Sequence, residues 1–292
     1  MSDLLHAWVL PELGVRGAAV RLGAGYRDIL KHQPYPDAVG RWLGEALAAA
    51  ALLQTGIKFN GRLSLQLQGG TALKLLYVES TSDGDLRGIA RFADEDFSAD
   101  FADAASGAVL AITLEPHRGE RYQGIVPLLG DNLAETLEGY FAQSEQLPTR
   151  LLLAGDGSHA AGLLLQRLPT EGGSAQVVDP DGWNRALHLL GTVAPTELLN
   201  TSSELLLHRL FHDVGQISRD PLPLHVRCRC SRDKVADVLR RIGRDDAFAA
   251  THEHGHAKIV CEFCGKTYRF DPIEIEQLFQ PQPIVLPPTG LQ

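Results

Sequence analysis

The chain has 292 residues, of which 44% are hydrophobic and 22% charged, and its formal net charge is −9 at neutral pH. This composition is that of an ordinary globular protein, and the length favours two domains of unequal size. The acidic balance argues against nucleic acid as a partner, because phosphate contacts need clustered Lys and Arg side chains. We find no basic, signal-like start and no apolar run near the roughly 20 residues of a membrane helix, so we expect a cytoplasmic protein with no membrane partner.

The first 170 residues mix helical and strand patterns without a regular alternation of the two. Apolar residues return near helical period over 39–53, which predicts a buried helix. Strict alternation over 62–68 predicts a half-buried strand, and Gly69 and Gly70 turn the chain into a hairpin partner at 73–78. Further strands are predicted at 86–92, 109–114, 151–154 and 161–166, and a second helix at 131–141 with Asp131 as its N-cap. The pattern indicates an α+β domain over residues 1–170.

A helical linker is predicted over residues 171–222. Residues 171–180 are rich in Gly, Ser, Asp and Pro, and two short amphipathic helices follow. The first ends at Gly191; the second begins at a capping box over 201–204 and ends at Gly215. Their apolar stripes need a cover, so they are either permanent core or a client-binding surface exposed by a switch. The candidate client-binding residues are Trp183, Leu187, Leu190, Leu206, Leu210 and Phe211.

All four cysteines lie in the last third of the chain, as Cys228-x-Cys230 and Cys261-x-x-Cys264, thirty residues apart. Two close pairs on a small module can supply four thiolates in tetrahedral geometry, the pattern of a structural zinc site. The alternatives are ordinary buried cysteines or a thioredoxin-like motif. The second needs a βαβ context, whereas short strands are predicted at 257–260 and 268–270. We therefore predict a zinc-binding domain over 223–280, with a helix at 234–242, that needs Zn²⁺ to fold.

Other features near the cysteines have weaker interpretations. His252, His254 and His256 could bind metal, but four thiolates already complete a tetrahedron. Basic residues flank the ligands, and neighbouring cations would favour the reactive thiolate; the alternative is that they are solvated charges. These residues are Arg227, Arg229, Arg232, Lys258 and Lys266. Residues 281–292 are proline-rich and predict a flexible tail. We see no P-loop, serine nucleophile motif or catalytic carboxylate pair, so we expect a protein that is not an enzyme.

With these motifs in place, the chain resembles the 33-kilodalton heat-shock protein family, the redox-regulated holdase chaperones of bacteria. The resemblance covers nearly the whole length: the cysteine spacing followed by residues 268–270, and the segments 15–17, 32–36, 58–69, 119–126 and 140–150 in order. It implies an inactive zinc-bound form. Oxidation would expel the metal, loosen the linker and expose apolar surface that holds unfolding clients without ATP.

The sequence alone leaves the disulfide connectivity open, because four cysteines allow three pairings. The resemblance implies Cys228–Cys230 and Cys261–Cys264 disulfides in the oxidised form, and a homodimer of that form is a further expectation. Two alternative functions are kept: a zinc-ribbon regulator that binds nucleic acid, which the acidic charge disfavours, and a thiol oxidoreductase, which would turn over a dithiol substrate.

Overall fold

The computed structural model describes residues 3–58, 60–93, 98–128, 130–169, 179–252 and 254–280. The chain divides into two compact units, Met1–Arg227 and Cys228–Gln292. Antiparallel sheets and helices are mixed through both units, so the α+β class predicted from the sequence is confirmed. Within the described ranges, no helix is long and apolar enough to cross a membrane.

Sheet A of the first unit has four long antiparallel strands in the order β1-β2-β9-β8. Their bounds are β1 (Leu4–Leu10), β2 (Val15–Leu22), β9 (Ala160–Arg167) and β8 (Thr149–Gly155). A 3-10 turn, η1 (Pro11–Leu13), joins the first two and ends at Gly14, whose φ of 62° favours glycine. Two short strands, β10 (Ile217–Ser218) and β11 (Leu222–Pro223), pair with the free edge of β1.

Sheet B has the order β12-β5-β4-β3-β6-β7. The strands are β3 (Gly61–Gln68), β4 (Leu73–Thr81), β5 (Asp85–Phe92), β6 (Val109–Pro116), β7 (Tyr122–Pro127) and β12 (His225–Val226). The predicted hairpin is confirmed: Leu63, Leu65 and Leu67 are buried on one face of β3, and Leu65 lies opposite Val78 of β4. The remaining strands are antiparallel neighbours, but β12 pairs with β5 in parallel.

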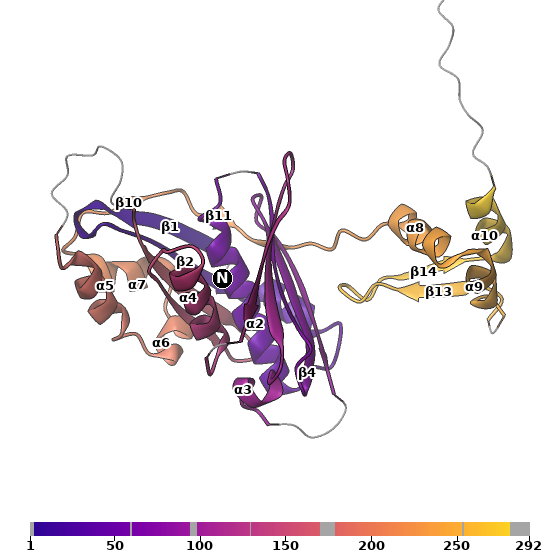
Figure 1. Cartoon of the computed structure of the whole chain (residues 1–292), viewed down its shortest axis with the longest axis horizontal. Coiled ribbons are helices and arrows are strands. Elements are labelled where there is room, and N and C mark those ends of the chain that lie inside the picture. Colours follow the sequence, from indigo (N-terminus) through magenta and orange to yellow (C-terminus); the bar gives the residue numbers. More distant parts are fainter. Residues whose placement is uncertain are drawn as a thin grey trace, which may run out of the picture. The chain divides into compact units, whose positions relative to one another are not determined.

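The long helix α2 (Asp37–Gln54) packs against strands of both sheets, and Figure 1 shows it between them. The predicted helix at 39–53 is confirmed, and every side chain from Ala46 to Leu53 is buried, because neighbours cover the helix on all sides. The helices α1 (Ala24–Leu30), α3 (Phe101–Ala104) and α4 (Leu133–Gln143) also lie in this unit, before the segment predicted as a linker. The N-cap predicted at Asp131 is wrong, since the side chain of Asn132 accepts the Glu135 N–H at 2.9 Å.

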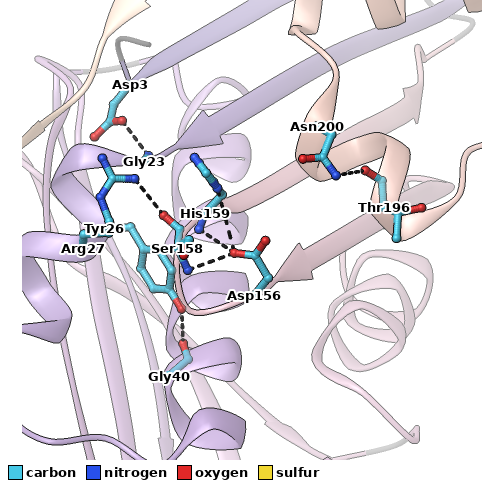
Figure 2. Close-up of polar contacts among 10 residues, drawn as sticks. All are labelled: Asp3, Gly23, Tyr26, Arg27, Gly40, Asp156, Ser158, His159, Thr196 and Asn200. Carbon is cyan, nitrogen blue, oxygen red and sulfur yellow. Dashed lines mark hydrogen bonds and ion pairs between the residues drawn. The ribbon is translucent and has the colours of Figure 1, made fainter.

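Polar contacts fix α1 between the start of α2 and the β8–β9 hairpin (Figure 2). The Tyr26 hydroxyl donates to the Gly40 carbonyl at 2.7 Å, and the Arg27 guanidinium donates to the Ser158 carbonyl at 3.1 Å. The Asp3 carboxylate accepts the Gly23 N–H at 2.7 Å. Of these three contacts the Tyr26 bond is buried, and a buried polar group with its partner in place helps to give the first core a single arrangement.

The linker helices α5 (Gly182–Leu190), α6 (Pro195–Asn200) and α7 (Ser203–Phe211) cover the face of sheet A that is turned away from α2 (Figure 1). Gly191 follows α5 as predicted. The predicted capping box is wrong: Ser202 caps α7 by accepting the Leu205 N–H, and no reciprocal bond from Glu204 is formed. The predicted stop at Gly215 is also wrong, because α7 ends at Phe211. Most of the predicted 171–180 segment lies outside the described residues.

The second unit contains α8 (Arg232–Ile242), α9 (Arg244–Ala249), the hairpin β13 (Ala257–Val260) and β14 (Thr267–Phe270), and α10 (Pro272–Phe279). The predicted helix at 234–242 and both predicted strands are confirmed. Its hydrophobic core is small. The core side chains are those of Val235, Ala236, Leu239, Ala247, Ala257, Tyr268, Phe270 and Ile275. The predicted tail, residues 281–292, lies outside the described part of the chain.

Candidate metal centre

The four cysteines come from two local structures of the second unit. Cys228 and Cys230 stand just before α8, whose N-cap Ser231 accepts the Lys234 N–H. Cys261 and Cys264 lie in the turn between β13 and β14, which is closed by a hydrogen bond from the Cys261 N–H to the Lys266 carbonyl at 2.9 Å. The pairing of the two strands therefore holds one cysteine pair in place, while the start of the helix holds the other.

The four sulfur atoms converge on one point. All lie within 4.8 Å of one another, and the Sγ–Sγ distances Cys228–Cys261 and Cys230–Cys264 are both 3.5 Å. Four sulfurs around one zinc ion at about 2.3 Å would be about 3.8 Å apart. Each cysteine is partly buried, and none is in a disulfide. The cluster thus has the donor type, number and spacing that a tetrahedral metal site requires.

The thiols differ in how easily they ionise. Burial raises the pKa of Cys228 and of Cys264. Burial also opposes ionisation of Cys230, but the Tyr268 hydroxyl, which donates to its sulfur at 3.1 Å, and the neighbouring thiols lower the pKa of Cys230 to about 7. The same hydrogen bond raises the pKa of Tyr268 to about 12. These neighbours therefore stabilise the thiolate of Cys230.

Tyr268 is a functional contact that the sequence reasoning missed. The sequence places Tyr268 in a predicted strand and in the motif that follows the cysteines, and nothing in its spacing from the cysteines marks its hydroxyl. The basic side chains near the cysteines, which were expected to favour the thiolate, make other contacts. Arg232 pairs with Glu274 at 2.6 Å and lies over the Phe270 ring, and Lys266 lies over the ring of Tyr268. The lowered pKa of Cys230 comes from Tyr268 and the other thiols, rather than from these side chains.

The histidines do not join the cluster. Among the described residues that could hold a metal, only the four cysteines form a group, and His254 and His256 contact each other with ring centroids 6.4 Å apart. They lie just before β13, and a ligand set of four thiolates stays a prediction. Glu253, between two of the histidines, lies outside the description.

The six predicted client-binding residues lie in or beside a second hydrophobic core, between the linker helices and sheet A. Leu190, Leu206, Leu210 and Phe211 are buried there, and Trp183 packs against it partly buried. Leu187 is partly exposed and lies outside this cluster. Leu190, Leu206, Leu210 and Phe211 are therefore covered in this structure.

The linker cover leaves some buried donors without partners. Leu4, His6 and Trp8 of β1 share the covered face of sheet A with Arg21, which lies opposite Leu4. The Trp8 Nε1 and the Arg21 Nε and Nη1 are buried and have no hydrogen-bond partner in the described part of the structure. A contact between His6 Nε2 and Glu204 Oε1, 3.3 Å apart, joins α7 to this face. Because unsatisfied buried donors each cost about 1–3 kcal/mol, this interface is less stable than its apolar area suggests.

The protein thus has two units. The first consists of two sheets packed around one buried helix, and the second is small and carries four clustered thiols as a candidate metal site. The family model described as Hsp33 protein matches residues 3–271. The 33 kDa chaperonin of Ectopseudomonas mendocina is 44% identical over 283 residues, covering 96% of each chain. That of Azotobacter vinelandii is 41% identical over 280 residues, covering 95% of this chain and 94% of the relative. The chain belongs to the Hsp33 family.

The structural comparison agrees on the fold. A crystal structure of the 33 kDa chaperonin (heat shock protein 33 homolog) from Thermotoga maritima superposes with a TM-score of 0.83 at 20% identity, covering 95% of this chain and 98% of that one. Family membership supports a chaperone role. The thiol cluster is compatible with a bound metal.

Proposed function

We propose that this protein is a redox-regulated, ATP-independent holdase that acts in the cytoplasm and binds unfolding proteins after its cysteines are oxidised. In this proposal residues 1–170 are the chaperone core, 171–222 the helical linker, 223–280 the zinc-binding switch and 281–292 a tail. The observation that carries it is the convergence of four reduced thiols, within 4.8 Å, in a unit whose own core is small.

We assign Zn²⁺ as the metal and Cys228, Cys230, Cys261 and Cys264 as its ligands. Four thiolates and no oxygen donor are the set that selects zinc among the common structural ions. When bound, the ion would supply a cross-link between the start of α8 and the β13–β14 turn, with a folding energy of about 10–16 kcal/mol in peptide hosts. The few apolar side chains of this unit leave it dependent on that cross-link.

The chemistry of the switch belongs to the sulfurs. A thiolate attacks one oxygen of an oxidant such as hydrogen peroxide and breaks the O–O bond, giving a sulfenic acid and hydroxide, which takes a proton from solvent to become water. A second thiol then displaces water from the sulfenic acid to form the disulfide. Two disulfides consume two peroxides and remove all four ligands. Cys230 is the proposed first nucleophile in the metal-free site, because the Tyr268 hydroxyl donates to its sulfur and stabilises the thiolate.

We propose Cys228–Cys230 and Cys261–Cys264 as the disulfides, following the family resemblance. The shortest sulfur distances here are instead Cys228–Cys261 and Cys230–Cys264, at 3.5 Å. All four atoms are close enough in the reduced form that contact alone does not select a pairing. The close pairs need the least chain rearrangement once the unit loosens.

Client binding follows from release of α5–α7. Their apolar stripes would become accessible, with the face of sheet A that they cover. Trp183, Leu187, Leu190, Leu206, Leu210 and Phe211 are the proposed contact residues. The unpartnered donors at Trp8 and Arg21 favour release, because both could then bond to water. A homodimer of the oxidised form is part of the same proposal, since newly exposed apolar surface can be covered by a second copy.

The deciding experiment measures aggregation of a heat-denatured client with the reduced and the oxidised protein, while released zinc is followed with a colorimetric chelator. Protection by the oxidised form alone, with one zinc released per chain, supports the proposal. Protection that is independent of redox state would overturn the switch and leave the chaperone role. The two rivals are tested in parallel: turnover of a dithiol substrate would indicate an oxidoreductase, and a gel shift at low salt a nucleic-acid regulator.

A further inference from the structure

A pocket of about 260 Å³ opens in the first unit, where β1, the end of α2 and the segment around β10 and β11 meet. Its apolar lining comes from Leu5 of β1, Ile57 just after α2, and Leu222 of β11. At about 30 Å³ per water, this volume corresponds to roughly nine waters. The pocket therefore has room for a small organic molecule or for one terminal residue of a polypeptide.

Charged side chains stand around this apolar lining. Lys58 and Arg219 contribute two positive charges and Asp220 one negative charge, which leaves a net charge of +1. In the described part of the chain, none of these three side chains has a hydrogen bond or an ion pair. A site with one excess positive charge complements a monoanion, and Asp220 would repel a second negative charge.

Two further polar side chains, Gln54 and Arg16, belong to this region. The Gln54 side chain lines the pocket and is only 6% exposed, and its buried Oε1 has no partner among the residues described. This oxygen is an acceptor, so it takes no part in binding an anion. Behind the pocket, Arg16 donates to the hydroxyl of Thr55, which is also part of the lining. Burial and the positive charge of Arg219 lower the pKa of Arg16. Arg16 has no carboxylate partner in the described ranges either, so positive charge gathers here without compensation.

We propose that this pocket binds a monocarboxylate that carries a short apolar chain. The carboxylate lies between Lys58 and Arg219, and the chain packs on Leu5, Ile57 and Leu222. This chemistry has two sources, a free short-chain acid and the apolar C-terminal residue of a polypeptide. The ligand would join the end of α2 to the segment after β10. The inference is independent of the redox proposal.

The test uses the reduced, zinc-loaded full chain and isothermal titration calorimetry. 4-Methylpentanoate represents the free acid and N-acetyl-leucine the polypeptide terminus; 4-methylpentanamide and inorganic phosphate are the matched probes that lack the carboxylate or the apolar chain. We expect saturable one-to-one binding of at least one carboxylate and about tenfold or weaker binding of the amide and of phosphate. Tighter binding of N-acetyl-leucine assigns the polypeptide source, and tighter binding of 4-methylpentanoate the free acid.

Variants locate the site. Lys58→Met and Arg219→Gln should each weaken carboxylate binding about tenfold, because each removes a charge-assisted hydrogen bond. Lys31→Met is the control, since Lys31 is 71% exposed, pairs with Asp28 and lies outside the pocket; it should leave binding unchanged. The proposal is overturned if neither carboxylate saturates by about 10 mM. It is also overturned if the amide binds as well as the acid, or if both pocket variants bind like the parent.

Discussion

The interface between α5–α7 and sheet A can be tested with the double variant Leu206→Ser, Leu210→Ser in α7. Both leucines are buried, 2% and 7% exposed, in the core between α5–α7 and sheet A. A buried leucine truncated to a small residue costs about 2–5 kcal/mol, and the new hydroxyl adds a desolvation cost. The two sites are one turn apart and share neighbours, so we expect about 4–8 kcal/mol for the pair. That is comparable with the whole stability of many domains.

The loss of stability should be confined to α5–α7 and should not affect the core around α2, because no α7 residue belongs to that core. The reduced double variant should therefore suppress client aggregation without oxidant. It should bind a hydrophobic dye and lose hydrogen-exchange protection over residues 182–211, while residues 39–53 stay protected. The matched control is Leu205→Ser, the neighbouring leucine on the same helix, which is 44% exposed and should change stability by about 0.5 kcal/mol or less.

A reduced double variant that stays inactive, with α7 as protected as in the parent, would refute this reasoning. The client surface would then have to lie outside the linker interface. A variant that loses protection in residues 39–53 as well would show that the two cores unfold together.

Three further predictions concern the thiol site and one buried carboxyl. Cys261→Ser should lose the metal and the exchange protection of residues 228–280 while the first unit keeps its melting transition; metal analysis showing one zinc retained would contradict the four-thiol site. Mass mapping of the oxidised protein should find Cys228–Cys230 and Cys261–Cys264, and a dominant Cys228–Cys261 product would exclude that pairing. Burial raises the pKa of Glu45 from 4.5 to about 7, with Arg41 opposing the shift. The folded chain keeps this proton up to a higher pH than the unfolded chain. The carboxyl therefore lowers the free energy of unfolding progressively as the pH rises from about 4.5 to 7. Glu45→Gln should therefore be more stable than the parent by about 1–3 kcal/mol at pH 8 and nearly equal to it at pH 4, as measured by urea unfolding.

The elements that the sequence predicted well are those with one buried face or with a regular spacing of apolar residues along the chain. Leu63, Leu65 and Leu67 alternate with polar residues, so one register alone buries them, and β3 follows that register. The cysteine spacing works in the same way. A C-x-C and a C-x-x-C on one small module bring their sulfurs together as soon as the β13–β14 turn and the start of α8 meet.

What the sequence did not predict depends on contacts distant in the chain. β1 and β2 were not predicted as strands. β2 is covered on both faces, so Ala18, Ala19 and Val20 follow one another without alternation. The parallel pairing of β12 with β5 involves two residues, too few for any local pattern. The Tyr268 contact with Cys230 arises from residues 38 positions apart and has no spacing rule.

Sheet A separates two cores with a single layer of backbone. Along β9, Leu164 points into the core around α2, while Leu163 and Leu165 point into the core beneath the linker helices. A departing linker would thus leave behind a platform that is still anchored from its other side, with apolar side chains at the fixed two-residue spacing of a strand. Clients would then bind to a rigid, ordered apolar surface. Once the thiols are reduced, α5–α7 could pack again on the same face of sheet A, and the core around α2 would not have to refold.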